Sequence, residues 1–528
     1  MPRSRLVTAA TLAPLLLASF LALPLEAQRF DVMEATIPSL HAALRANRTS
    51  CREVVQAYLD RIAAYDKEGP ALNAIQNVHP RALAIADSLD ASRRAREPMG
   101  PLHCVPVVVK DQIETSSMPT TYGSKLFADF TPERDATTVL RLQAAGAIVI
   151  AKATMGEFAQ RYVSSSAGII RNAYDRTRNP SGSSGGTASA VAANFGLVGI
   201  GEDTGGSIRG PAAVSNLVGL RPTLPLISRF GMMPASPTQD TMGPMTRTVA
   251  DAARVLEVIA GYDAKDPVTA ESYGRVPANY STALKADALR GVRLGILRTP
   301  RDSAQRARDP EGFAAFDSLF TAAVADLRAL GAEIVDSLDI PVLRQRGGGG
   351  NDYETEAATN AYLAEHPNAP VKTLADILTS GEVVPWRARS LYGSAGQSTN
   401  DIGYLAVMKR REAVRTGVLQ AMADQRLDAI IYLTFDAPAT VIAEDVMTNP
   451  RPTDGYGLGD NRGLSPTLAY PALTVPAGFA PNGMPAGLEF LGRPYSEQQL
   501  LAFGFAYEQR SKHRRAAPTA PALARSGR

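Results

Sequence analysis

The sequence is poor in the residues that most often carry enzyme chemistry. Its 528 residues include two cysteines, Cys51 and Cys104, and five histidines, at positions 41, 79, 103, 366 and 513. Two cysteines do not make a disulfide framework, and the sequence leaves their pairing open. The histidines show neither metal-ligand spacing nor the order of a Ser-His-Asp triad. We therefore expect no metal site and no cofactor.

The sequence also lacks a strong excess of charge. The formal net charge is +3, and the tail alone carries six basic residues: Arg510, Lys512, Arg514, Arg515, Arg525 and Arg528. The rest of the chain is therefore slightly acidic. Such a balance offers no basic groove for nucleic acid, so we expect a small molecule rather than a nucleic acid as the ligand.

Long uncharged apolar runs are missing except at the N-terminus. Arg3 and Arg5 precede an uncharged stretch over residues 6–25, and Ala27 ends a plausible cleavage site. This pattern predicts a signal peptide over residues 1–27 and a periplasmic or secreted mature protein. An uncleaved membrane anchor is the alternative, because the stretch is nearly long enough to span a bilayer.

What is present is typical of a large α/β protein, with 45% apolar and 20% charged residues. Residues 105–109 form a short apolar run, and residues 137–153 give a helix, a glycine stop and a strand, a unit that recurs at 320–338. The alternation predicts a mostly parallel sheet with helices on both faces. Length alone suggests two to four domains.

Lys110 ends the apolar run that precedes it. A lysine at the end of a buried strand loses hydration, which lowers its pKa and favours the neutral amine, a form that can act as a base. Two alternatives remain, in which the side chain reaches the surface or pairs with Asp111.

A glycine-rich stretch, "NPSGSSGGTASA", holds Ser183 and Ser184 before a helix of small residues. Glycines permit close backbone approach, and the start of a helix supplies free N–H donors. A phosphate loop is excluded because no Lys-Ser or Lys-Thr pair follows Gly186. An ordinary turn is the alternative.

A second stretch, "GEDTGGSIRG", delivers Ser207 from a glycine turn after an apolar strand, as expected of a nucleophile. The backbone N–H groups of Thr204, Gly205, Gly206 and Ser207 could converge on an oxyanion. The G-x-S-x-G elbow is excluded, since Arg209 stands where its last glycine belongs. Because no histidine lies within a hundred residues of Ser207, another residue type must accept its proton.

These stretches, together with "DTMGPMTRTVADAA" and "YPALTVPAGFAPNGMPAGLEFLGRPYSEQQLLAFGFAYEQ", closely resemble the amidase signature family over about residues 34–511. The resemblance implies one α/β/α domain around a large mixed, mostly parallel twisted sheet. On this basis we expect the amidase domain at residues 28–515 and a basic, flexible tail at 516–528.

The resemblance also implies a Ser-cisSer-Lys triad, with Ser207 as nucleophile, Ser183 as the bridging serine in a cis peptide and Lys110 as base. Ser184 matches a supporting position of the family. The residues matching positions that shape the nucleophile loop are Asp203 and Arg209.

Two positions depart from the family pattern: Cys104 and Ser181 stand where relatives usually have glycine. Neither departure removes a triad member. A cysteine nucleophile at Cys104 beside His103 would leave the Ser207 turn unexplained.

The residues that suggest an apolar acyl site are Met155 and Phe158, together with Tyr162 and Trp386, although these residue types are more often core than pocket. Residues 353–367 read as a helix that either lines the entrance or covers the core.

The sequence thus predicts an exported amidase that hydrolyses a carboxylic amide C–N bond through a serine acyl-enzyme. We expect no obligate partner chain, and a homodimer is possible. The alternatives are the A-type subunit of a glutamine amidotransferase, against which the signal peptide argues, and a non-catalytic binding protein on the same fold.

Overall fold

The computed structural model describes residues 30–298, 303–336, 338–345, 350–454 and 461–524. The segment expected to be a signal peptide, residues 1–27, lies outside them. Among the helices of the described ranges, none combines the length and the apolar character needed to cross a membrane.

An eleven-stranded sheet runs through the molecule in the order β1-β3-β2-β6-β8-β7-β12-β13-β11-β9-β10. Its strands are β1 (Ile75–Val78), β2 (Pro106–Lys110), β3 (Ile148–Ala153), β6 (Val198–Asp203), β7 (Val218–Arg221), β8 (Thr241–Thr246), β9 (Arg293–Ile296), β10 (Glu333–Val335), β11 (Ala429–Leu433), β12 (Ala472–Phe479) and β13 (Pro485–Leu491). A separate two-stranded sheet pairs β4 (Val163–Ser164) with β5 (Gly168–Ile169).

The sheet is mixed, as expected, but parallel pairs are not in the majority. Four of its ten pairings are parallel: β3 with β2, β2 with β6, β11 with β9 and β9 with β10. The centre is antiparallel, because consecutive strands such as β12 and β13 are joined by a short turn through Gly483, at φ 80°. Strands that are buried along their whole length give the same apolar runs in either direction, so the sequence pattern could not separate the two cases.

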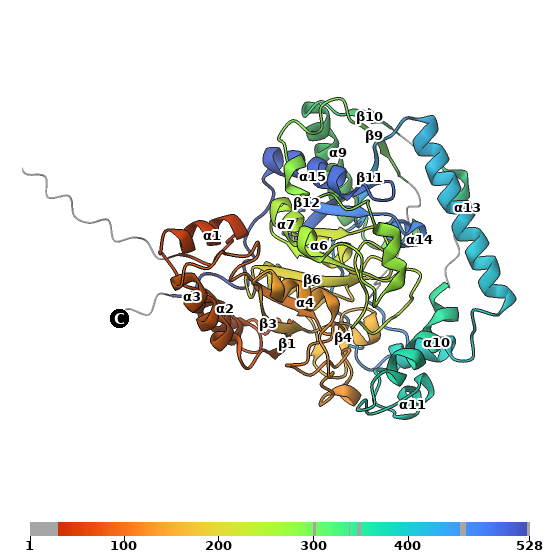
Figure 1. The fold of residues 1–528 in the computed structure, drawn as a ribbon. Coiled ribbons are helices and arrows are strands. Elements are labelled where there is room, and N and C mark those ends of the chain that lie inside the picture. Colours follow the sequence, from red (N-terminus) through yellow and green to blue (C-terminus); the bar gives the residue numbers. More distant parts are fainter. Residues whose placement is uncertain (1–29, 299–302, 337, 346–349, 455–460, 525–528) are drawn as a thin grey trace, which may run out of the picture.

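Helices cover both faces of the sheet (Figure 1). The α-helices are α1 (Ile37–Arg45), α2 (Cys51–Tyr65), α3 (Ala82–Arg94), α4 (Thr137–Ala144), α5 (Gly185–Ala192), α6 (Arg209–Val214), α7 (Val249–Ile259), α8 (Ser303–Arg308), α9 (Pro310–Ala329), α10 (Gly350–Ala364), α11 (Leu374–Thr379), α12 (Pro385–Ser394), α13 (Ile402–Asp424), α14 (Leu464–Leu468) and α15 (Glu497–Ser511). Short 3-10 helices are η1 (Lys125–Phe127), η2 (Glu157–Ala159), η3 (Pro267–Ser272), η4 (Ser281–Ala283) and η5 (Pro341–Gln345).

The arrangement is the expected α/β/α domain. Helices α5 and α6 pack on one face of the sheet, where Ala213 of α6 lies against Gly487 of β13. On the opposite face α15 packs on Leu473 and Val475 of β12, alongside α7 and α9. Helices α10 to α13 lie farther out, on the side away from α1, α2 and α3 (Figure 1).

Helix α5 is the buried central helix that its small residues predict, and all eight of its residues are buried. A side chain at Gly186 would meet the Thr154 carbonyl oxygen at 2.2 Å, so only glycine allows this approach. The start of α5 is therefore held close to Thr154, just after β3, and the helix also contacts β2 and β6.

The C-terminal segment differs from the flexible tail expected at 516–528. Over the described part, to residue 524, Ala517 and Ala520 are buried. Arg61 donates to the carbonyl oxygens of Ala520 and Pro521 at 2.6 and 2.8 Å, and Thr519 donates to Ala173 at 2.6 Å. The alanines supply apolar contacts that a count of basic residues does not register.

The two cysteines form a disulfide. Cys51 begins α2, Cys104 lies just before β2, and their Cα atoms are 5.2 Å apart. Both are buried, and the bond joins α2 to the segment that leads into Lys110. It also removes Cys104 as a candidate nucleophile, since a disulfide sulfur is not a thiolate.

Candidate active site

The three residues expected to form the triad come from adjacent parts of one sheet edge. Lys110 is the last residue of β2, and Ser207 lies in the loop between β6 and α6. The two strands are parallel neighbours, with Val109 opposite Ile200, so both end at the same edge. Ser183 lies in the loop that leads into α5, with its Oγ 2.6 Å from Lys110 Nζ.

Lys110 is fully buried and has three polar partners. Its Nζ lies 2.6 Å from Ser183 Oγ, 2.7 Å from Glu202 Oε2 and 3.3 Å from the Glu202 carbonyl oxygen. Burial lowers the pKa of Lys110 below its ordinary value, and the Glu202 carboxylate opposes this effect only in part. Neither alternative for Lys110 holds, because it does not reach the surface, and Asp111 faces Lys152 at 3.5 Å instead.

The serine loop is held by close backbone contacts. The Gly182–Ser183 peptide bond is cis, as the resemblance implies. A side chain at Gly182 would meet the Arg161 carbonyl oxygen at 1.6 Å, and the Gly156 N–H donates to the Ser183 carbonyl at 3.0 Å. Ser184 donates to the Glu202 carbonyl at 3.0 Å, so it supports the oxygen that also faces Lys110.

The nucleophile loop presents Ser207 to solvent. Ser207 is half-buried and Gly205 is exposed, whereas Ser183 and Lys110 are fully buried. The chain turns at Gly206 with φ 119°, a conformation that favours glycine.

The four N–H groups expected to hold an oxyanion do not all remain available. The Gly206 N–H donates to Asp203 Oδ1 at 2.6 Å. The expected set is therefore reduced to the N–H groups of Thr204, Gly205 and Ser207, and their role in holding an oxyanion stays a prediction. The glycines in the sequence predict the turn. They do not show that the Asp203 carboxylate accepts the Gly206 N–H.

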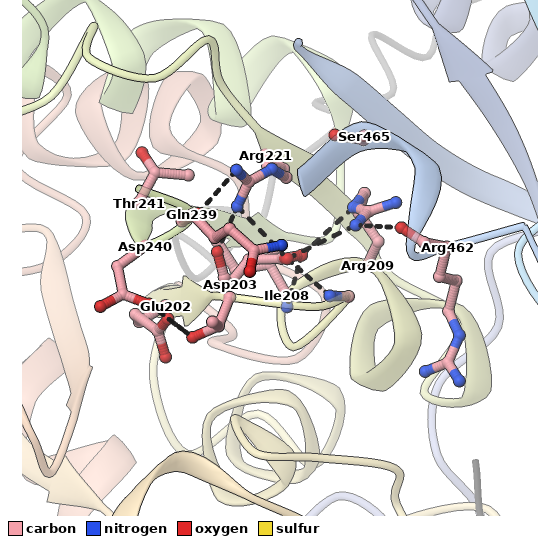
Figure 2. A network of polar contacts seen from close by, with 12 residues as sticks. Glu202, Asp203, Ile208, Arg209, Arg221, Gln239, Asp240, Thr241, Arg462 and Ser465 are labelled. Carbon is pink, nitrogen blue, oxygen red and sulfur yellow. Dashed lines mark hydrogen bonds and ion pairs between the residues drawn. The ribbon is translucent and has the colours of Figure 1, made fainter. Parts of the chain in front are cut away.

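Asp203 and Arg209 fix the shape of this loop (Figure 2). Asp203 also accepts the Ile208 N–H at 3.1 Å, and Arg209 Nε donates to its carboxylate at 3.1 Å. Arg209 also forms an ion pair with the buried Glu489 on β13. Burial would raise the pKa of Asp203, but Arg209 and Arg221 outweigh it and hold that pKa well below its usual range.

Sequence reasoning missed a pair of acids beneath the triad. The Thr204 hydroxyl lies 2.6 Å from Glu202 Oε1 and 2.7 Å from Asp240 Oδ1, and all three residues are buried. Burial and the neighbouring Glu202 raise the pKa of Asp240. Glu202 is the second-last residue of β6, five positions before Ser207, and that position was its only signal in the sequence.

A narrow, mainly apolar cavity of about 20 Å³ has Met155 in its wall, next to Gly156, whose N–H donates to the Ser183 carbonyl. Met155 and Phe158, expected to line a pocket, both line it, as do Thr355 and Thr359 of α10. The helix expected at 353–367 is thus part of the cavity wall. Tyr162 and Trp386 instead pack with each other in a separate cluster.

The chain is similar to known proteins over most of its length. The family model described as "Amidase" matches residues 53–501. A probable amidase of Arabidopsis thaliana is 33% identical over 91% of this chain and 90% of its own length. The A-type subunit of the glutamyl-tRNA(Gln) amidotransferase of Myxococcus xanthus is 36% identical over 92% of this chain and its own full length. The solved structure of the peptide amidase from Stenotrophomonas maltophilia is 35% identical, with a TM-score of 0.79 over 92% of this chain and 99% of the other.

Proposed function

Because the chain belongs to the amidase signature family, we propose that it is an exported amidase that cleaves a carboxylic amide through an acyl-enzyme on Ser207. The observation that carries the proposal is the 2.6 Å contact between the fully buried Lys110 Nζ and Ser183 Oγ. This contact joins a buried amine, which is removed from water, to a serine hydroxyl at the edge of the sheet where Ser207 also lies.

The proposed reaction begins when neutral Lys110 accepts the Ser183 proton and Ser183 takes the proton of Ser207. Ser207 Oγ then attacks the amide carbonyl carbon, and the N–H groups of Thr204, Gly205 and Ser207 receive the resulting oxyanion. The proton returns through Ser183 to the leaving nitrogen, which departs as ammonia or an amine. Water repeats these steps on the acyl-enzyme and releases the acid.

The apolar wall of this narrow cavity suits the acyl part of a substrate, for which the cavity would have to widen. Met155, Phe158 and Met233 give it an apolar wall, and Thr355 and Thr359 add hydroxyl groups. An apolar acyl group that buries surface there gains hydrophobic stabilisation. Substitution of Thr359 by Phe should therefore raise KM for large acyl groups more than for acetyl amides.

The signal pattern in residues 1–27 and the disulfide together support export. Disulfides form and persist in oxidising compartments such as the periplasm and the extracellular space. The Cys51–Cys104 bond therefore fits a protein that folds after export.

A second candidate function comes from the relatives that belong to glutamyl-tRNA(Gln) amidotransferases. Under this hypothesis the chain would hydrolyse glutamine and hand ammonia to a partner protein. The signal pattern favours the amidase, since charged tRNA is found in the cytoplasm. Glutaminase activity that rises only when partner proteins are added would favour the second candidate.

The test is release of p-nitroaniline and of ammonia from a panel of anilides and primary amides by the purified protein. Ser207→Ala, Ser183→Ala and Lys110→Ala should each lose at least about a hundredfold in kcat/KM, because each breaks the proton path. Ser272→Ala, a buried serine of η3 outside the site, is the matched control and should retain wild-type turnover.

Full turnover in Ser207→Ala would contradict the proposed nucleophile. A wild-type protein that neither turns over an amide nor reacts with a fluorophosphonate would instead be a non-catalytic binding protein on the same fold.

A further inference from the structure

Glu202 is a buried acid that the reaction above does not use. Its side chain is fully buried between Lys110 and Thr204, with Oε2 2.7 Å from Lys110 Nζ and Oε1 2.6 Å from the Thr204 hydroxyl. A buried carboxylate carries a large desolvation penalty, so its place beside the triad lysine calls for a physical account.

The three partners of Lys110 Nζ differ in what they can do. The Glu202 carboxylate and the Glu202 carbonyl oxygen are acceptors only, whereas the Ser183 hydroxyl can also donate. A neutral amine has two N–H groups and one lone pair. Both hydrogens therefore go to Glu202, and the lone pair points at the Ser183 hydroxyl, the direction that proton abstraction needs.

The number of hydrogens available around the Thr204 hydroxyl shows which of its two acidic neighbours, Glu202 or Asp240, carries a proton. The two short contacts of the Thr204 oxygen, with Glu202 and with Asp240, need two hydrogens, and the hydroxyl supplies one. A carboxyl group must supply the second. Asp240 forms no ion pair within the described part of the chain, and its Oδ2 accepts the N–H groups of Ala235 and Ser236 at 2.8 Å each. Asp240 therefore carries the hydrogen, and Glu202 stays ionised against Lys110.

Charged groups act on Glu202 and Lys110 from several elements of the sheet. Lys110 of β2 faces it directly, and Asp240 faces it from the residue before β8. Arg221 of β7 donates to the Gln239 carbonyl at 2.7 Å and lies 3.4 Å from Asp203 (Figure 2), and its charge also acts on Glu202. The charge of Asp203 on β6 acts on Lys110 and favours its ammonium form.

We propose that Glu202 is a positioning residue for Lys110: it holds two hydrogens of the amine so that the lone pair faces Ser183, and Thr204 and Asp240 hold its carboxylate in place. The inference rests on the proposed function, in which Lys110 is the base. The same carboxylate stabilises the ammonium form, so it also determines the pH at which Lys110 becomes neutral.

The test is the rate at which a fluorophosphonate labels Ser207, measured as a function of pH, which needs no knowledge of the substrate. In Glu202→Gln the amide oxygen can still accept from Lys110 while the negative charge is lost. Thr204 then donates to an ionised Asp240, whose charge is farther from the lysine. The labelling midpoint should therefore move to lower pH by about 1 unit or more.

Glu202→Asp separates position from charge, because the shorter side chain keeps the carboxylate but draws it away from Lys110. The labelling rate at its plateau should fall about tenfold or more, as expected when a reacting group is misplaced by about 1 Å. Glu497→Gln is the matched control, a buried glutamate that accepts the Thr223 N–H at 2.6 Å and has no contact with the triad. Its labelling profile should coincide with that of the wild type.

Thermal melts show which variants are folded. If one Glu202 variant does not fold, the other still tests the inference. The inference is overturned if a folded Glu202→Gln has the wild-type midpoint or loses labelling at every pH, or if Glu202→Asp keeps the wild-type plateau. A wild-type protein that is not labelled at all contradicts the proposed function first, and this inference with it.

Discussion

At the scale of single residues, the two positions that depart from the family pattern share a backbone conformation that favours glycine. Cys104 and Ser181 have φ of 61° and 60°, in the left-handed region where glycine is favoured. Cys104 is engaged in the disulfide. Ser181 gains less, since its buried hydroxyl has no hydrogen-bond partner among the described residues.

Replacing Ser181 with glycine should therefore stabilise the protein. The substitution removes about 1–2 kcal/mol of backbone strain and an unsatisfied hydroxyl, against a loss of about 0.5–1 kcal/mol in chain entropy. We expect the urea midpoint to rise by an amount equivalent to about 1 kcal/mol. An unchanged or lower midpoint would show that the hydroxyl has a stabilising contact.

Predictions about single residues succeed where neighbouring residues in the sequence determine the feature. Burial of Lys110 follows from the apolar run that it ends, and the tight turn before Ser207 follows from its glycines. The contact between Lys110 and Glu202 joins residues 92 positions apart and depends on the pairing of β2 with β6. The sequence contains both residues but not that pairing.

At the scale of elements, the loop between β6 and α6 depends on a charged chain buried in the sheet. Asp203 on β6, Arg209 at the start of α6 and Glu489 on β13 are all fully buried. The guanidinium group balances two carboxylates, so its loss would leave Glu489 uncompensated and Asp203 with Arg221 alone.

Arg209→Met should therefore cost about 3–5 kcal/mol in the free energy of unfolding. Fluorophosphonate labelling should fall as well, because Asp203 would no longer be held against the Gly206 and Ile208 N–H groups. Urea denaturation measures the first effect. An exposed ion pair gives the control: Arg298→Met, which breaks a contact with Asp336, should cost no more than about 1 kcal/mol. Equal costs for the two variants would contradict the account.

Element types were predicted better than their directions. The small residues of α5 predict a buried helix because large side chains cannot fit where it packs. The direction of β12 against β13 is determined by a turn, and the apolar pattern of either strand is the same in both orientations. The extent of the core was underestimated at the C-terminus, where Ala517 and Ala520 are buried beside Arg61.

At the scale of the whole molecule, the disulfide closes a loop across 53 positions and joins α2 to the site-bearing part of the sheet. The double variant Cys51→Ala/Cys104→Ala should lose about 3–4 kcal/mol in the free energy of unfolding, as expected for a loop of this length. Denaturation of the wild type with and without a reductant is the companion measurement. If reductant has no effect on the wild type, the bond is absent in solution.

Stability should also depend on pH through Glu508 of α15, which accepts the Val249 N–H at 2.9 Å. Burial, with a contribution from Asp251, raises the pKa of Glu508 to about 7. Because the folded-state pKa is raised, the associated stability is complete below about pH 4.5, the ordinary value, and is lost as the pH rises through about 7.

Glu508→Gln keeps the acceptor and removes the charge. Its unfolding free energy should exceed that of the wild type by about 3 kcal/mol above pH 7, and the difference should vanish in acid. Denaturation curves at several pH values measure this difference. A difference in unfolding free energy that does not change with pH would show that Glu508 is not the group responsible for the pH dependence.

The central claim is that Ser207 is a nucleophile activated by Lys110 through Ser183. Its most direct test is fluorophosphonate labelling of the wild-type protein, followed by mass-spectrometric mapping of the modified residue, beside Ser207→Ala and Lys110→Ala. The account predicts one adduct on Ser207, none in Ser207→Ala and a labelling rate lower by at least about a hundredfold in Lys110→Ala. An adduct on another residue, or undiminished labelling without Lys110, would contradict it.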